Sequence, residues 1–355
     1  MSILIYGATG FTGRRVAEAL VVAGHEVTVA GRDTDRTRAL AEVLKVPWRA
    51  APVEDPVALA RAVEGAAIVV NCAGPFSQLG EPLLQAALAG GASFADISGE
   101  QAYARDIYER YESRARRERR AVVLGLAFEP AVADWAASLA AAQLGPGRVD
   151  EVVLGYALSR VPFTPGLINS MRAVLAAPAV VWAHDRWEPA WPAGDQQILG
   201  FPDPFGSHLA IPAPLAAVIT VPRHTDTAAV RTLVSAGRAS PARKLALKLV
   251  AAAAPAVARS PLTAEVGALA PTVPTDDELS RASVAVIAEA RRGFDRARVA
   301  VVGSDPYRIT AAIVALGVRA LAEREGALAP TELVAPAEAL DSLRESAGIH
   351  IERDS

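Results

Sequence analysis

The sequence is poor in the residues that build disulfide frameworks and metal centres. Its single cysteine, Cys72, excludes an intrachain disulfide and a cysteine-based zinc site. The five histidines are scattered and form no His-Glu-x-x-His motif, so we expect no catalytic zinc and no bound metal. Acidic and basic residues nearly balance, at 39 and 36, and the net charge of −3 gives no basic field that would recruit nucleic acid.

Long apolar runs are also missing. No stretch reaches the ~18 apolar residues of a membrane-spanning helix, and the nearest one, residues 245–258, is interrupted by Lys248 and Pro255. That stretch is compatible with a buried core helix or with an interfacial or dimer-forming helix. Because the first residues lack a basic leader and run directly into a glycine turn, they do not resemble a signal peptide, and we expect a cytoplasmic protein.

The chain does contain a large hydrophobic fraction and a regular alternation of strands and helices in its first third. With 355 residues, of which 52% are hydrophobic and 21% charged, it is long enough for two well-packed domains. Residues 1–128 alternate short apolar strands with helices, beginning with a strand over 3–6, a helix over 14–23 and a strand over 26–30. This alternation predicts an α/β fold, a Rossmann-type doubly wound parallel sheet with helices on both faces.

The pattern changes after Glu129. A predicted helix over 130–144 is followed by strands near 149–159, 284–289 and 296–302, two of which alternate as antiparallel strands do. We therefore expect a second, α+β domain over residues 129–304 with a mixed or antiparallel sheet. Periodic helices over 307–324 and 330–346 follow in a C-terminal segment, residues 305–355.

The strongest motif is a glycine-rich turn between the first strand and the first helix. A dinucleotide pyrophosphate needs a tight turn, a backbone that it can approach closely, and the free N–H groups of a helix N-terminus. The residues that meet these needs are Gly7, Ala8, Thr9, Gly10, Phe11, Thr12 and Gly13. Because strand, turn, helix and second strand follow in the right order, we predict a dinucleotide site; the alternative is a structural turn without a ligand.

The end of the second strand predicts which dinucleotide binds. NAD sites place an acidic residue there for the ribose 2′-hydroxyl, whereas this chain has Gly31-Arg32. A guanidinium pairs with a 2′-phosphate and stacks on adenine, so we predict NADP as the cofactor. The alternative is a solvated surface arginine.

Other oxidoreductase and hydrolase motifs are missing. None of the six tyrosines is followed four residues later by a lysine, which excludes the Tyr-x-x-x-Lys chemistry of the short-chain dehydrogenases. There is no Gly-x-Ser-x-Gly elbow, so a serine hydrolase is not expected.

Several segments together resemble the saccharopine dehydrogenase-like oxidoreductases, including the branch of trans-acting enoyl reductases. The segments that carry the resemblance are 6–13 with 30–32, Asn71-Cys72-Ala73-Gly74-Pro75-Phe76, Asp96-Ile97-Ser98-Gly99-Glu100, and 303–307. Residues 125–130 and 163–171 depart from the pattern of that branch, so the resemblance is good at both ends of the chain and poor in the middle.

The resemblance implies a nicotinamide site at the carboxyl edge of the sheet. It places there two strand-exit loops, one made of Asn71, Cys72, Ala73, Gly74, Pro75 and Phe76, the other containing Ser98 and Gly99. Both could also be ordinary loops, and Cys72 fits a small buried residue better than a nucleophile. The resemblance further implies that the C-terminal helices pack back on the first domain and that the protein forms a homodimer.

Hydride transfer to a C=N or C=C bond also requires a proton source or polarising group. The candidates are Glu100, Glu129, Asp134 and Tyr156, although each acid could equally be a helix cap or an ion-pair partner. Arg160 and Asn169 could line the cleft from the second domain. The Trp- and Pro-rich residues 182–214 predict either an apolar substrate pocket or ordinary packing of that domain.

These observations predict an NADPH-dependent oxidoreductase that reduces a C=N or C=C bond in a small or lipid-like metabolite. One alternative is a trans-acting enoyl reductase of a polyketide or lipid pathway. The other, prompted by the lack of an obvious catalytic acid, is a non-catalytic NADP-binding sensor or scaffold.

Overall fold

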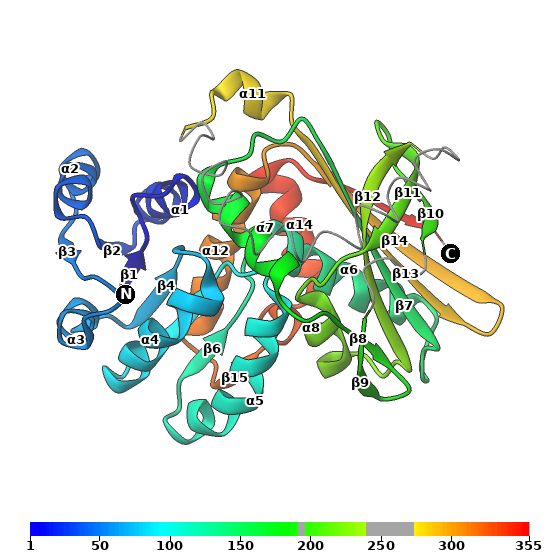
Figure 1. The fold of residues 1–355 in the computed structure, drawn as a ribbon, viewed down its shortest axis with the longest axis horizontal. Coiled ribbons are helices and arrows are strands. Elements are labelled where there is room, and N and C mark those ends of the chain that lie inside the picture. Colours follow the sequence, from blue (N-terminus) through cyan, green and yellow to red (C-terminus); the bar gives the residue numbers. More distant parts are fainter. Residues whose placement is uncertain (191–195, 239–272, 355) are drawn as a thin grey trace.

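The computed structural model describes residues 1–190, 196–238 and 273–354, and it is built around two β-sheets (Figure 1). The first sheet has the strand order β15-β6-β5-β4-β1-β2-β3, and every neighbouring pair is parallel. Its strands are β1 (Ser2–Tyr6), β2 (Glu26–Gly31), β3 (Trp48–Ala50), β4 (Ile68–Asn71), β5 (Ser93–Asp96), β6 (Ala121–Val123) and β15 (Gly326–Leu328).

Alternate residues of these strands face two separate layers of helices. Ile3 and Ile5 pack in one buried cluster with α1 (Phe11–Val22), whereas Leu4 and Tyr6 pack in another with α4 (Phe76–Ala89). The first layer also contains α2 (Thr34–Leu44) and the second α3 (Pro56–Val63) and α5 (Gln101–Arg117). Continuous apolar strands such as Ile3–Tyr6 form because both faces are buried, and the predicted doubly wound parallel sheet is confirmed.

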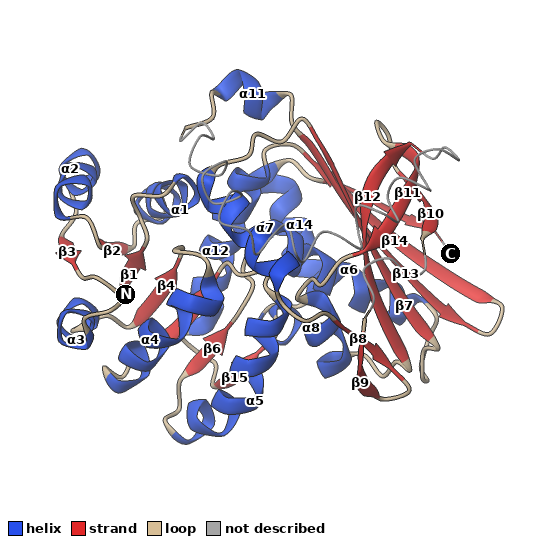
Figure 2. Ribbon diagram, viewed as in Figure 1, coloured by secondary structure: helices blue, strands red, loops and turns tan. Residues whose placement is uncertain are grey.

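The second sheet is mixed, in agreement with the predicted α+β domain (Figure 2). Its main order is β10-β11-β12-β7-β13-β14-β16, in which the pair β12 and β7 is parallel and the other pairs are antiparallel. The strands are β7 (Glu151–Ser159), β10 (Gln197–Phe201), β11 (Gly206–Pro212), β12 (Ala229–Arg238), β13 (Ser283–Arg292), β14 (Asp295–Gly303) and β16 (His350–Asp354). In addition, β8 (Val180–Ala183) pairs with β12, and β9 (Arg186–Pro189) pairs with β8.

Helix α6 (Phe128–Gln143) lies between the two sheets and joins their cores. Its buried residues pack in one cluster with Val152, Leu154 and Tyr156 of β7 and with the α1 face of the first sheet. The chain therefore brings the carboxyl edge of the first sheet close to one face of the second.

The last fifty residues contribute to both sheets. Helix α12 (Pro306–Leu321) packs against α1, β15 extends the first sheet beside β6, and β16 pairs with β14. Pro336 divides the helix expected over 330–346 into α13 (Pro330–Leu333) and α14 (Pro336–Ala347), because proline cannot donate the hydrogen bond that would continue α13.

The remaining helices are α7 (Pro165–Ala176), α8 (Ala217–His224) and α11 (Asp276–Ser280). Among the residues that the structure describes, no helix is long and apolar enough to span a membrane. The stretch 245–258 and most of 239–275 lie outside the described residues, as does Trp191.

Candidate functional site

The glycine turn between β1 and α1 has the geometry of a pyrophosphate cradle. Gly7 has a φ of +77°, and a β-carbon there would lie 2.8 Å from the backbone nitrogen of Ala73. A β-carbon on Gly13 would collide with the carbonyl oxygen of Gly7. No side chain caps the α1 N-terminus at Gly10, so the first N–H groups of the helix are available to an anion.

Two arginines follow β2: Arg32, which the sequence predicted, and Arg36 in the first turn of α2. Arg32 follows Gly31 and is exposed. Asp33 caps α2 by accepting a hydrogen bond from the Arg36 backbone, at 3.0 Å, and the Arg36 guanidinium donates to the Thr9 carbonyl at 3.1 Å. The cap places Arg36 at the third position of α2, and from there its side chain reaches back to the glycine turn. The sequence analysis did not predict a role for this residue.

The β4 exit loop lies next to the glycine turn. Its first residue, Asn71, is fully buried and accepts a hydrogen bond from the Ala73 backbone at 2.9 Å, while its Nδ2 has no hydrogen-bond partner among the described residues. Burial raises the pKa of Cys72 to about 12, so this thiol is a poor nucleophile. A β-carbon on Gly74 would lie 2.9 Å from Ser170 Oγ, which shows that α7 contacts this loop.

The β5 exit loop is held by a buried aspartate. Asp96 Oδ1 accepts hydrogen bonds from the backbones of Ser98 and Gly125, at 3.0 and 2.9 Å. Burial raises the pKa of Asp96 to about 7, although these two amides oppose the increase. Ser98 Oγ in turn accepts a hydrogen bond from the Glu100 backbone, so the loop has a fixed shape.

Two of the four candidate acid–base residues make structural contacts. Glu100 accepts hydrogen bonds from the backbones of Phe76 and Ser77, at 2.7 and 2.9 Å, and so caps the N-terminus of α4. Asp134 accepts from His224 at 2.9 Å and from the Thr331 backbone at 2.8 Å, which ties together α6, α8 and α13. Although burial acts in the opposite direction, His224 lowers the pKa of Asp134.

The other two candidates, Glu129 and Tyr156, lie together. Burial raises the pKa of Glu129 to about 8, and the Tyr156 hydroxyl offsets part of the increase. Burial and the Glu129 carboxylate raise the pKa of Tyr156 well above its ordinary value. The contact falls short of a well-formed hydrogen bond, so Glu129 Oε1 and the Tyr156 hydroxyl are both without a partner in the described part of the chain.

Gly99 touches the same carboxyl group. A β-carbon on Gly99 would collide with Glu129 Oε2. The carboxyl group, supplied by the first turn of α6, therefore lies against the β5 exit loop, while the Tyr156 hydroxyl is supplied by β7 of the second sheet.

The described part of the Trp- and Pro-rich segment packs within the second domain and, through Trp187, against a buried cluster of the first sheet. Trp182 and Trp187 are in edge-to-face contact at 4.6 Å, and Trp182 Nε1 donates to the Thr227 carbonyl. Of the two residues expected to line the cleft, Arg160 is exposed just after β7 and Asn169 is half-buried on α7.

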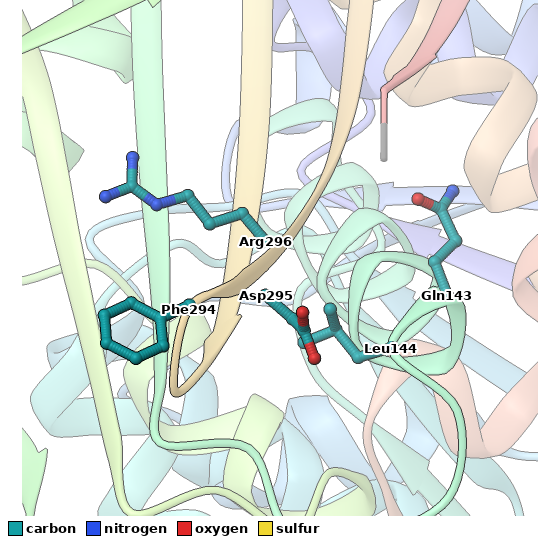
Figure 3. A pocket seen from close by; sticks show the side chains of 5 residues that line it. All are labelled: Gln143, Leu144, Phe294, Asp295 and Arg296. Atoms are coloured by element: carbon teal, nitrogen blue, oxygen red, sulfur yellow. The ribbon is translucent and has the colours of Figure 1, made fainter.

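One open recess, of about 490 Å³, is at another place (Figure 3). Its walls are formed by Gln143, Leu144, Phe294, Asp295 and Arg296. Gln143 ends α6, and the fifteen residues from Phe128 correspond to roughly 22 Å of helix, so the recess is separate from the cofactor loops.

Comparisons with known proteins agree with this geometry. Residues 3–124 match the family model of the saccharopine dehydrogenase NADP binding domain, which confirms NADP as the predicted cofactor. Apo saccharopine dehydrogenase (L-Glu forming) from Saccharomyces cerevisiae covers 100% of this chain with a TM-score of 0.66 and 15% identity, a likeness that shows the fold alone.

Curated relatives match only part of the chain. A Mycobacterium tuberculosis protein provisionally named a trans-acting enoyl reductase is 32% identical over 184 residues, which are 49% of this chain and 44% of that protein. A trans-acting enoyl reductase from the same species is 30% identical over 139 residues, covering 37% and 33% of the two chains. A lipid droplet localized protein of Caenorhabditis elegans is 31% identical over 145 residues, covering 37% and 34%. The matched region therefore spans less than half of each relative.

Proposed function

We propose that this chain, whose residues 3–124 form an NADP-binding domain of the saccharopine dehydrogenase type, is an NADPH-dependent oxidoreductase. The observation that carries the proposal is the glycine cradle. β-carbons on Gly7 and Gly13 would collide with the backbones of Ala73 and Gly7, so only glycine allows the tight turn that offers the α1 N–H groups to a pyrophosphate. We keep the division into residues 1–128, 129–304 and 305–355 as part of this proposal.

In this proposal, each loop at the carboxyl edge of the first sheet binds a different part of the cofactor. The N–H groups of the α1 N-terminus bind the pyrophosphate, and Arg32 with Arg36 binds the 2′-phosphate of the adenosine half. The loops 71–76 and 98–99 hold the nicotinamide half, which supplies a hydride when the cofactor is bound. Ser170 of α7 touches Gly74 and helps to exclude water from the reacting atoms.

The substrate that we propose is a small or lipid-like metabolite with a C=N or C=C bond. The names of two relatives favour an enoyl group, as in a trans-acting enoyl reductase of a lipid or polyketide pathway. Helix α7 supports an apolar substrate, because its Met171 and Leu175 are exposed and none of its residues is fully buried. We also propose that the protein is a homodimer and that it is located in the cytoplasm.

Cofactor choice is tested by fluorescence titration with NADPH and NADH. We expect tighter binding of NADPH, and we expect Arg32→Glu to weaken NADPH at least tenfold while it leaves NADH nearly unchanged, since a carboxylate repels the 2′-phosphate. Arg61→Glu, an exposed charge reversal on α3, is the matched control and should change neither affinity. Equal affinities of the wild-type protein for both cofactors would contradict the assignment.

Bond type is tested with two sets of acceptors. Enoyl thioesters of increasing chain length and cyclic imines are supplied with NADPH, and the loss of NADPH absorbance is followed. Turnover of thioesters alone supports the enoyl reductase, and turnover of imines alone supports C=N reduction. Tight NADPH binding with no turnover of either set would favour the non-catalytic sensor or scaffold.

A further inference from the structure

A carboxyl group and a phenol without hydrogen-bond partners meet where the two domains touch. Neither Glu129 Oε1 nor the Tyr156 hydroxyl has a partner among the described residues, and both atoms are buried. Buried polar groups are almost always hydrogen-bonded, because an unsatisfied one destabilises the fold. Beyond the contact that these two groups make with each other, the carboxyl group and the hydroxyl can therefore hydrogen-bond to a bound molecule.

Their place in the fold indicates which end of the cofactor they face. The strand order reverses between β1 and β4, so a dinucleotide crosses the sheet at that point. The arginines at the end of β2 mark the adenosine side, and β4, β5 and β6 therefore lie on the nicotinamide side. Glu129 follows β6 in the chain and touches Gly99 in the exit loop of β5.

Gly99 supports placing Glu129 on the nicotinamide side, because the lack of a side chain at Gly99 lets the carboxyl group lie directly against the backbone of the β5 exit loop. A β-carbon at this position would push the Glu129 carboxyl group away from the loop. The contact therefore depends on glycine, and it fixes the carboxyl group at the edge where the nicotinamide ring is proposed to bind.

We propose that Glu129 is the proton donor of the reduction and that Tyr156 is the residue that positions its carboxyl group. This inference rests on the proposed function. In the step, the π bond of the substrate breaks, one of its atoms receives the hydride from NADPH, and the other receives the proton of Glu129. The substrate gains two electrons, the nicotinamide loses them, and the Glu129 carboxylate regains a proton from solvent after product leaves.

The electrostatic surroundings suit a donor at neutral pH. Burial keeps the pKa of Glu129 near 8, so the group is mostly protonated before the reaction. The titratable groups that act on the pair are Tyr156 on β7 and, through Tyr156, Asp134 on α6. Two other acids near these loops have structural partners, since Glu100 caps α4 and Asp134 pairs with His224. The third, Asp96, holds the β5 exit loop through Oδ1, while its Oδ2 has no partner among the described residues.

Infrared difference spectroscopy of the full chain tests the inference without a known substrate. We expect a protonated carboxyl band at neutral pH that titrates near the pKa of about 8, is absent in Glu129→Gln, and shifts when NADPH is added. Tyr156→Phe should raise the pKa of this band, because the hydroxyl lowers it. Glu338→Gln and Tyr111→Phe, which remove an exposed carboxyl group and a remote hydroxyl, should leave the band unchanged.

Turnover provides the second measurement once an acceptor is found. We expect Glu129→Gln to bind NADPH as tightly as wild type and to lose about 100-fold or more in kcat, together with the limb of the pH profile above neutrality. A Glu129 that is ionised at neutral pH, a band unmoved by bound NADPH, or full turnover by Glu129→Gln would each overturn the inference while the proposed function stands. A wild-type protein that fails to bind NADPH would overturn the proposed function itself.

Discussion

At the scale of single residues, contact distances decide which glycines of the cofactor turn can be replaced by alanine. In Gly13→Ala, the new methyl group meets the Gly7 carbonyl oxygen, which is backbone and cannot rotate away. We therefore expect the turn to shift, NADPH affinity to fall at least tenfold and stability to fall by about 1–3 kcal/mol. Gly200→Ala on β10, where a β-carbon meets nothing within 4 Å, is the control for titration and thermal unfolding. Unchanged NADPH affinity in Gly13→Ala would show that the turn does not hold the pyrophosphate.

Residue spacing was enough to predict a site that lies on one continuous segment. Three glycines and a following arginine lie within the first strand–helix–strand unit, where chain order determines which groups come together. The roles of the four candidate proton donors depend instead on distant contacts: Asp134 meets His224, and Glu129 meets Gly99 and Tyr156. A role for Arg36 follows only when the helix start is fixed by the Asp33 cap, because that start turns the Arg36 side chain toward the glycine turn.

At the scale of secondary-structure elements, one buried ion pair joins three helices. His224 at the end of α8 bonds Asp134 of α6, whose second oxygen accepts from Thr331 at the start of α13. His224→Ala leaves a buried carboxylate with one partner, so we expect a loss of about 3–5 kcal/mol in the free energy of unfolding, measured with denaturant. His184→Ala, with its side chain 82% exposed, should change this free energy by less than about 0.5 kcal/mol.

The Asp134–His224 ion pair stabilises the fold only within a defined range of pH. Asp134 raises the pKa of His224 despite burial, so that part of the stability is lost as pH rises through the raised value. The lowered pKa of Asp134 acts at the other end, where stability is lost as pH falls. The difference between wild type and His224→Ala should therefore be largest between these two pKa values, and a difference independent of pH would contradict the ion pair.

Elements were predictable where periodicity extended over several turns or strands. Apart from β3, the helices and strands of residues 1–128 follow from apolar patterns, as does the hairpin of β13 and β14. The three-residue strands β3 and β15 were missed because so short a segment carries no period, and β16 because its pairing with β14 depends on the return of the chain. Helix α1 begins at Phe11, before the predicted start, because the glycine turn is already closed by the hydrogen bond from Gly10 to Gly7.

At the scale of the whole molecule, two buried carboxyl groups, one at the end of β5 and one at the start of α6, predict how stability depends on pH. Burial raises the pKa of Glu129 to about 8 and that of Asp96 to about 7, both above the values of an unfolded chain. A group of this kind stabilises the fold fully below its unfolded pKa, and the stabilisation is lost as pH rises through the folded pKa. We therefore expect the wild-type free energy of unfolding to fall between about pH 4.5 and 8, by up to roughly 1.4 kcal/mol per pH unit for each group.

Glu129→Gln separates the two contributions, because glutamine keeps the size of the side chain and cannot ionise. Its unfolding free energy should decline less than that of wild type over the whole interval and should be nearly flat between the two folded pKa values, about 7 and about 8. Denaturant unfolding at several pH values measures this directly, with Glu338→Gln on α14 as the exposed control. Since NADPH is proposed to pack against Glu129, adding it should also change the slope of wild type and leave that of Glu129→Gln unaltered. Parallel curves for wild type and Glu129→Gln would mean that the carboxyl group is solvated and that the domains do not close over it.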